Sequence, residues 1–178
     1  MKVMFKIPIG PISTNSAYYK RNRAFNEKAR NWRYTFLSHL QNSYNQKQIA
    51  TIKNHFNPQK HALRCAFIWY QPHSILFTSS SQISLRSMDV DNCLKIPTDL
   101  LFDKKYNDKW LSLRKGAEAK LYNDMHSLCN LDINDKFIVD TRSIKLPSPD
   151  GQFHCSIIVE VVELSKLTST AFTSNLKL

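Results

Sequence analysis

The sequence is poor in glycine and has no long apolar run. It contains three glycines and seven prolines among 178 residues, which excludes collagen-like and other low-complexity classes. No apolar stretch reaches the roughly 20 residues that a membrane-spanning helix needs. The opening residues, MKVMFKIPIG, lack the apolar core of a secretory signal peptide. We therefore expect a cytoplasmic protein that does not enter a membrane.

Cysteine is also sparse, and its spacing is wide. The four cysteines form no Cys-x-x-Cys pair and no Cys/His pattern with the spacing of a zinc site: Cys65, Cys93, Cys129 and Cys155. In a chain without an export signal, their number alone does not argue for disulfides. We expect reduced thiols that are mostly buried.

Acidic side chains are nearly absent from the first half of the chain. Residues 1–88 contain 13 Lys and Arg but a single acid, Glu27, whereas residues 89–178 contain 12 Lys and Arg and 13 acids. A basic half of this kind indicates a polyanionic partner. The alternative is a basic surface that serves solubility alone.

The most basic stretch mixes cations with aromatic residues, as AYYKRNRAFNEKARNWR. Such a mixture can neutralise phosphates and stack on bases, although a solvated loop leading into a helix has the same composition. We predict that it binds DNA through a set of basic residues: Lys20, Arg21, Arg23, Arg30 and Arg33.

The hydrophobic pattern predicts one α+β domain over residues 1–164, a small mixed β-sheet with helices packed on it. The expected strands are 2–8, 62–70, 136–146 and 153–164, with the last two forming a hairpin. The expected helices are 26–48, with an apolar stripe from Ala29 to Tyr44, a segment within 109–122, and 93–102, where Pro97 must fall in the first turn. The tail, 165–178, is expected to be poorly ordered.

The stretch SMDVDNCLK interrupts the basic half with two carboxylates, Asp89 and Asp91. Side chains two residues apart share a face only in extended backbone. Converging carboxylates repel each other, and a divalent cation such as Mg²⁺ relieves that repulsion. Lys95 follows one helical turn later and could stabilise the charge of a phosphate. The alternative is a helix cap and turn, for which Asp and Asn are common.

A metal site of this kind usually includes a further acid. Asp135, just before the third strand, is one candidate. The composition alone does not choose between it and four others: Asp99, Asp103, Asp132 and Asp140.

Three blocks of the chain resemble the RusA family of Holliday junction resolvases. PISTNSAYYKRNR resembles the family's Pro-x-Ser-x-Asn element and the Tyr/Arg-rich loop after it. DVDNCLKIPTDLL resembles the signature Asp-x-Asp-Asn-x-x-Lys-x-x-x-Asp-x-Leu, and NDKFIVDTRSIKLP resembles the Asp-Asp-x-x-Val segment with its strand. With the closing strand, the blocks cover most of residues 3–163.

The resemblance implies a RusA-like homodimeric endonuclease that makes paired nicks in four-way DNA junctions with Mg²⁺, or with Mn²⁺ as a substitute. By position it implies that Asp89, Asp91 and Asp135 hold the metal and that Lys95 is the functional lysine. The same blocks assign supporting roles to Asn15, Tyr19 and Asn92. In the family, the acids of two subunits gather near the dimer interface on a basic DNA-binding face.

The chain departs from the family pattern at three places. Asn134 stands where the family has an acid paired with the third aspartate, Met88 stands where basic residues are frequent, and residues 103–131 resemble an insertion. These departures motivate an alternative, a RusA-like DNA-binding protein with weak or no cleavage activity. An unrelated basic scaffold, in which the acids only cap a helix, is a third reading.

Overall fold

A computed structural model of the chain describes residues 1–17, 26–84, 87, 89–102 and 117–167, with side chains omitted for 15, 16 and 117–119. Four strands form one sheet: β1 (Lys2–Ile7), β2 (His61–Gln71), β3 (Ile138–Pro147) and β4 (His154–Glu163). The helices described are α1 (Thr14–Ala17), α2 (Glu27–Leu40), α3 (Ser43–His55), α4 (His73–Leu76), α5 (Lys95–Phe102), α7 (Ala117–Cys129) and α8 (Leu164–Leu167). Two 3₁₀ turns, η1 (Asp91–Cys93) and η2 (Asp135–Phe137), precede α5 and β3.

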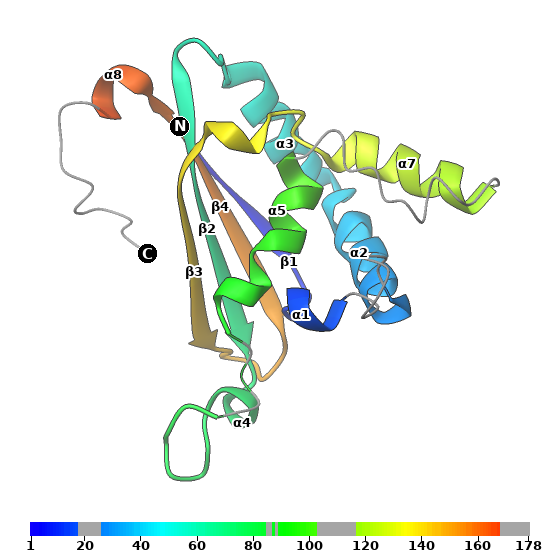
Figure 1. The fold of residues 1–178 in the computed structure, drawn as a ribbon, viewed down its shortest axis with the longest axis vertical. Coiled ribbons are helices and arrows are strands. Elements are labelled where there is room, and N and C mark those ends of the chain that lie inside the picture. The colour runs from blue at the N-terminus through cyan, green and yellow to red at the C-terminus, as the bar shows by residue number, and fades with distance from the viewer. Residues whose placement is uncertain (18–25, 85–86, 88, 103–116, 168–178) are drawn as a thin grey trace.

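The sheet is mixed, in the order β1-β4-β2-β3, which confirms the predicted α+β class. β4 pairs antiparallel with β1 and with β2, whereas β2 and β3 run parallel. The strands β1, β2 and β3 therefore run in the same direction, and their C-terminal ends lie together at the bottom of the sheet in Figure 1. We call this side, where the strands end, the lower edge, as distinct from the edge strands β1 and β3. The segments that follow these three strands are brought together there.

The predicted hairpin between the last two strands is wrong. β3 and β4 are consecutive in the chain, but β2 lies between them and hydrogen-bonds to both. β2 carries almost continuous apolar residues and is buried along most of its length, as a strand covered on both faces should be. This burial makes β2 the central strand and places β3 at the edge.

Helices cover one face of the sheet, so the domain has two layers there (Figure 1). The main core lies between these layers and includes Phe67 and Trp69 of β2 together with Phe36 and Leu40 of α2. On the other face, a smaller cluster joins Ala66, Ile68 and Ile158. The large core fixes the helices, and with them the segments that enter the lower edge.

The predicted helix 26–48 is two helices. Asn26 caps α2 by accepting a hydrogen bond from the Ala29 amide, and Asn42 caps α3 by accepting one from the Asn45 amide, at 2.8 Å. A capping side chain satisfies backbone donors that a helix start leaves open, so Asn42 begins a new helix and redirects the chain. Tyr44, expected in the apolar stripe, is consequently 46% exposed.

The other expected elements have mixed outcomes. α5 is confirmed, and Pro97 lies in its first turn. Of the helix expected within 109–122, residues 109–116 lie outside the described residues, and α7 begins at Ala117. The expected tail begins with α8, and residues 168–178 lie outside the described part.

No described helix is long and apolar enough to span a bilayer. All four cysteines are free and buried, as predicted.

Asn45 ties α3 to the outer edge of β1. The side chain is fully buried; its oxygen accepts a hydrogen bond from the Lys6 amide at 3.2 Å, and its nitrogen donates to the Lys6 and His39 carbonyls at 3.1 and 3.0 Å. Edge strands leave backbone groups unpaired. The Asn45 side chain pairs with the amide and the carbonyl of Lys6 as a neighbouring strand would.

We predict that Asn45→Ala lowers the free energy of unfolding by about 2 kcal/mol, because the Lys6 amide and carbonyl lose their side-chain partner. Urea unfolding followed by circular dichroism measures the change. Asn54→Ala, at an exposed position of the same helix, is the matched control and should be close to neutral. Equal losses in the two variants would contradict the role of Asn45.

Candidate metal and nucleic-acid site

Asp89 and Asp91 lie in an exposed turn, here called the acidic turn (residues 89–92), which leads into α5. The expected extended backbone is not present, because Val90 is helical (φ −60°, ψ −39°) and Asp91 already begins η1. The reason is local: the turn tightens into a 3₁₀ helix before α5 starts. The side-chain Nδ2 of Asn92 donates a hydrogen bond to Oδ2 of Asp89 at 3.4 Å.

Two hydrogen bonds attach this part of the chain to the rest of the domain. Thr14 Oγ1 of α1 donates to the Asn92 carbonyl at 2.9 Å, and Lys145 Nζ of β3 donates to Ser87 Oγ at 2.7 Å. A third bond is local, because the Cys93 thiol donates to the Asp89 carbonyl at 3.2 Å. The segments after β1 and β2 thus meet the end of β3, as the strand directions require.

Lys95 lies on the exposed side of α5. Its ammonium forms an ion pair with Asp99, four residues further along the helix, at 3.3 Å, and its side chain is 62% exposed. Exposed pairs of this spacing contribute little to stability. Lys95 is therefore accessible at the first turn of the helix that follows the two acids.

Asp135 lies at the other end of α5. Its 3₁₀ turn, η2, precedes β3 and packs against α5, and the neighbouring Leu131 amide donates to the carbonyl of Leu101 near the end of that helix. Eight residues of α-helix span about 12 Å. Figure 1 shows α5 running from the acidic turn up to η2. One chain therefore does not gather Asp89, Asp91 and Asp135 into one cluster.

Asn134, which replaces an acid of the family pattern, has a structural role here. It is the N-cap of η2, and its side-chain oxygen accepts a hydrogen bond from the Lys136 amide at 3.0 Å. Asp135 itself is exposed. At this end of α5, the exposed carboxylate of Asp135 therefore lies next in the chain to Asn134, whose side chain caps η2.

The donors of the acidic turn suit a hard divalent cation. Mg²⁺ in proteins is often held by one or two carboxylates, with waters and substrate phosphates completing its shell. Asp89 and Asp91 supply carboxylate oxygens at the surface. Within the described part of the chain, no three His, Cys, Asp or Glu side chains come together as a metal site. Each of the two carboxylates is a ligand of the kind that Mg²⁺ binds, but the helical backbone at Val90 does not place them on one face as an extended chain would.

Residues 18–25 of the basic stretch lie outside the described residues, and these include Tyr19, Lys20, Arg21 and Arg23; the side chain of Asn15 is not described either. Its two ends are placed, however, because the Asn26 amide donates to the Ala17 carbonyl at 2.8 Å. Ala17 ends α1, the helix that Thr14 attaches to the acidic turn. The basic stretch therefore leaves and re-enters the described fold close to that turn.

The expectation that Arg33 faces DNA is wrong. Arg33 is 1% exposed, and its guanidinium lies over the ring of Tyr122, 5.0 Å from the ring centroid. The helix α7, which carries Tyr122, packs on α2, and the spacing of residues along α2 alone could not reveal this contact. Arg30, one turn earlier, is partly exposed. Of these two residues, only Arg30 is exposed enough to contact a partner, and its contact with DNA stays a prediction.

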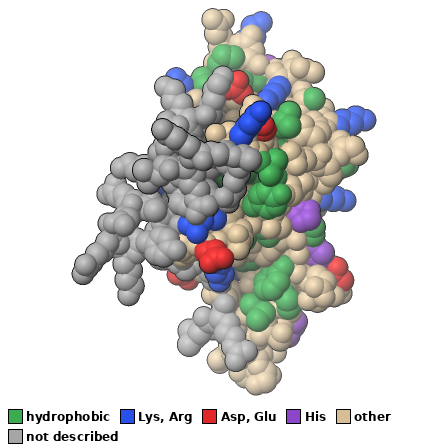
Figure 2. Space-filling view, turned by 90° about the vertical axis from the view of Figure 1, so that its right-hand side faces the viewer, with side chains coloured by type: hydrophobic (Ala, Val, Ile, Leu, Met, Phe, Trp, Pro, Cys, Tyr) green, Lys and Arg blue, Asp and Glu red, His purple; other side chains and the backbone are tan. Residues whose placement is uncertain are grey.

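Described charges are scattered on the side of the molecule that faces the viewer in Figure 2. Lys and Arg side chains are spread among hydrophobic and His side chains there, with few acids between them. Among the described residues, this view shows no single basic patch. Three of the predicted DNA-binding residues fall between Ala17 and Asn26, which lie close to the acidic turn.

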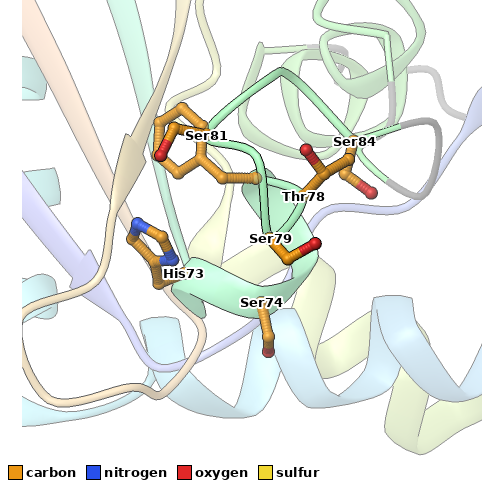
Figure 3. A pocket seen from close by; sticks show the side chains of 7 residues that line it. His73, Ser74, Thr78, Ser79, Ser81 and Ser84 are labelled. Atoms are coloured by element: carbon orange, nitrogen blue, oxygen red, sulfur yellow. The ribbon is translucent and has the colours of Figure 1, made fainter.

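A hollow of about 540 Å³ lies in the loop after β2. Figure 3 shows the ring of His73 on one side of it and the hydroxyls of Thr78 and Ser84 on the other. The described residues of its lining carry mostly hydroxyl groups and no carboxylate: His73, Ser74, Phe77, Thr78, Ser79, Ser81 and Ser84. A site without carboxylates does not suit Mg²⁺, so the acidic turn is the better candidate.

The comparisons with known proteins leave the family undecided. A scan against protein-family models finds no match to the chain. No curated protein matches it either. The resemblance to the RusA family stays a prediction that depends on the three blocks of motif residues.

Sequence reasoning missed three residues of this site: Thr14, Ser87 and Lys145. Lys145 is 58 residues from Ser87 in the chain, and Thr14 is 78 residues from Asn92. No local pattern marks contacts over such distances. The parallel pairing of β2 with β3 could have indicated Lys145, because it places the ends of both strands at one edge.

The cysteine closest to the acidic turn should be chemically inert. Burial raises the pKa of the Cys93 thiol to about 11, and burial raises that of Cys65 and of Cys129 to about 12. Burial also raises the pKa of Cys155. Because the thiolate is the reactive form, the native thiols remain protonated and unreactive at neutral pH.

We predict that the native protein reacts with Ellman's reagent only slowly at neutral pH and that all four thiols react at once in guanidinium chloride. Absorbance of the released thiolate follows both reactions. A thiol that reacts rapidly in the folded protein would contradict this burial. If the rapid reaction is lost in Cys93→Ser, the reacting thiol is that of Cys93.

Proposed function

We propose that the chain is a RusA-like, Mg²⁺-dependent endodeoxyribonuclease that resolves four-way (Holliday) DNA junctions by paired nicks. The observation that carries the proposal is the attachment of the acidic turn to α1, where the basic stretch begins. It supports the proposal because the two exposed carboxylates lie close to Ala17 and Asn26, which flank the residues that we predict to bind DNA. A cation bound by the acids would meet phosphates there.

The residues divide the work as their chemistry allows. Asp89 and Asp91 would hold Mg²⁺ or Mn²⁺, with Asn92 contacting the Asp89 carboxylate. A bound divalent cation supplies an activated water and a Lewis acid for the phosphodiester. Lys95, exposed one helical turn after Asp91, would stabilise negative charge on the phosphate. The basic stretch would bind the DNA backbone.

Asp135 fits this proposal only in a dimer. It lies at the far end of α5 from the acidic turn in its own chain. A homodimer in which the acids of two subunits gather, as the family resemblance implies, would allow Asp135 to approach the acids of the partner. Two sites related by a two-fold axis also suit the cutting of two opposed strands.

A second candidate function is a RusA-like protein that binds branched DNA without cutting it. Asn134 favours this reading, because its side chain is engaged in capping η2 and does not supply a second carboxylate beside Asp135. Such a protein would bind junctions in EDTA as well as the nuclease would. Cleavage therefore separates the two functions, and binding does not.

We predict that Asp91→Asn abolishes Mg²⁺-dependent nicking of a labelled four-way junction, with a loss of more than about 100-fold, since even an outer-shell partner of a metal typically contributes 10–100-fold. Gel electrophoresis of the products measures it. Asp124→Asn, an exposed acid on α7, is the matched control and should cut normally. Equal cleavage by both variants would remove Asp91 from the site, and a mere helix-cap role would change only stability, by about 1 kcal/mol.

We also predict that Arg21→Ala combined with Arg23→Ala weakens junction binding and flattens its salt dependence. Each phosphate contact contributes about 0.9 to the slope of log K against log salt, so the slope should fall by about 1.8. Fluorescence anisotropy over a salt titration in EDTA measures it. Lys47→Ala with Lys60→Ala removes the same charge from exposed positions elsewhere, and an equal effect of this pair would contradict a local role for the basic stretch.

A further inference from the structure

A lysine from the sheet reaches the segment that carries the acids. Lys145 lies near the end of β3, opposite Trp69 of β2. Its side chain is partly buried, and its ammonium donates to Ser87 Oγ at 2.7 Å. Ser87 precedes Asp89 by two residues. The end of β3 is thereby attached to the start of the acidic turn.

A buried cysteine restrains the next part of the same segment. Cys93, just after the acidic turn, is buried and donates its thiol hydrogen to the Asp89 carbonyl at 3.2 Å. Lys145 contacts Ser87, two residues before Asp89. Hydrogen bonds therefore restrain this segment at both Ser87 and Asp89.

We propose that Lys145 is a positioning residue for the metal site: through Ser87 it holds the acidic turn in the conformation in which Asp89 and Asp91 bind a divalent cation. The inference depends on the proposed function, since it assumes that the acidic turn binds metal. A charge-assisted hydrogen bond from a partly buried lysine is stronger than a neutral one. It restrains a turn that is otherwise exposed to solvent.

The sign of the effect distinguishes positioning from simple repulsion. If Lys145 acted only as a nearby positive charge, its removal would tighten the binding of a divalent cation. If it positions the turn, its removal loosens the turn and weakens binding, by about 10-fold as for other outer-shell partners. The two roles predict opposite changes of one dissociation constant.

The test measures Mn²⁺ binding to the full-length protein without DNA, by electron paramagnetic resonance of the free ion. Lys145→Met should weaken binding about 10-fold, and Lys145→Arg should restore part of it because the donor charge is kept. Ser87→Ala should weaken binding in the same direction, and the double variant should be no worse than Lys145→Met alone if both act through one contact. Lys120→Met, an exposed lysine on α7, is the control and should bind as the wild type does.

Thermal unfolding of each variant shows whether it folds, and Ser87→Ala keeps the test valid if Lys145→Met does not. Unchanged or tighter Mn²⁺ binding by folded Lys145→Met and Ser87→Ala would overturn the positioning role. Weaker junction binding by Lys145→Met in EDTA, with unchanged Mn²⁺ binding, would overturn it in favour of a phosphate contact.

Failure of the underlying function has a different signature. Wild-type protein that binds no Mn²⁺, or Asp91→Asn protein that binds it as the wild type does, would remove the metal site and this inference with it. Wild-type binding that Asp91→Asn abolishes and Lys145→Met leaves intact would refute the role of Lys145 alone. The proposed function would then stand.

Discussion

The position of β2 between β3 and β4 is the constraint on which the rest of the structure depends. β2 is apolar along nearly its whole length and is buried on both faces. It therefore requires a partner strand on each side, and it finds them in two strands that are consecutive in the chain. With β2 between β3 and β4, β2 pairs parallel with β3 and antiparallel with β4. The C-terminal ends of β1, β2 and β3 therefore lie together at the lower edge.

The candidate site follows from that edge. The segment after β1 provides Thr14, the segment after β2 provides the acidic turn, and β3 provides Lys145, all joined by hydrogen bonds of 2.7 to 2.9 Å. Asp135 precedes β3 and therefore lies toward the opposite edge, one length of α5 away. The same topology that assembles the acidic turn thus separates it from the third acid, which is why a second subunit enters the proposal.

Much of this fold could be predicted from local pattern. The strands and α5 have strong periodicity, and Pro97 limited where α5 could begin. The predictions that failed concern features that depend on contacts between distant parts of the chain. A turn-linked pair of strands has the same pattern whether or not β2 lies between them, and the burial of Arg33 under Tyr122 depends on α7. The division of the helix at Asn42 is different, because the capping residue was visible in the sequence.

The site itself was predictable only in its residue types. Asp89 and Asp91 were visible as two acids directly after a basic half of the chain, with the amide of Asn92 beside them. Their backbone was not, since a short polar segment fits both extended chain and a 3₁₀ turn, and Val90 adopts the latter. Lys145 was not visible either, since only the sheet brings it to Ser87.

The central claim is metal-dependent resolution of a branched DNA, and strand-resolved mapping of nicks tests it most directly. Wild-type protein would be incubated with a four-way junction labelled on each strand in turn, in Mg²⁺ and in EDTA. The account predicts a pair of nicks at symmetric positions on two opposed strands, in Mg²⁺ only. A junction that is bound and shifted in gels, but uncut on every strand in Mg²⁺ and in Mn²⁺, would contradict it.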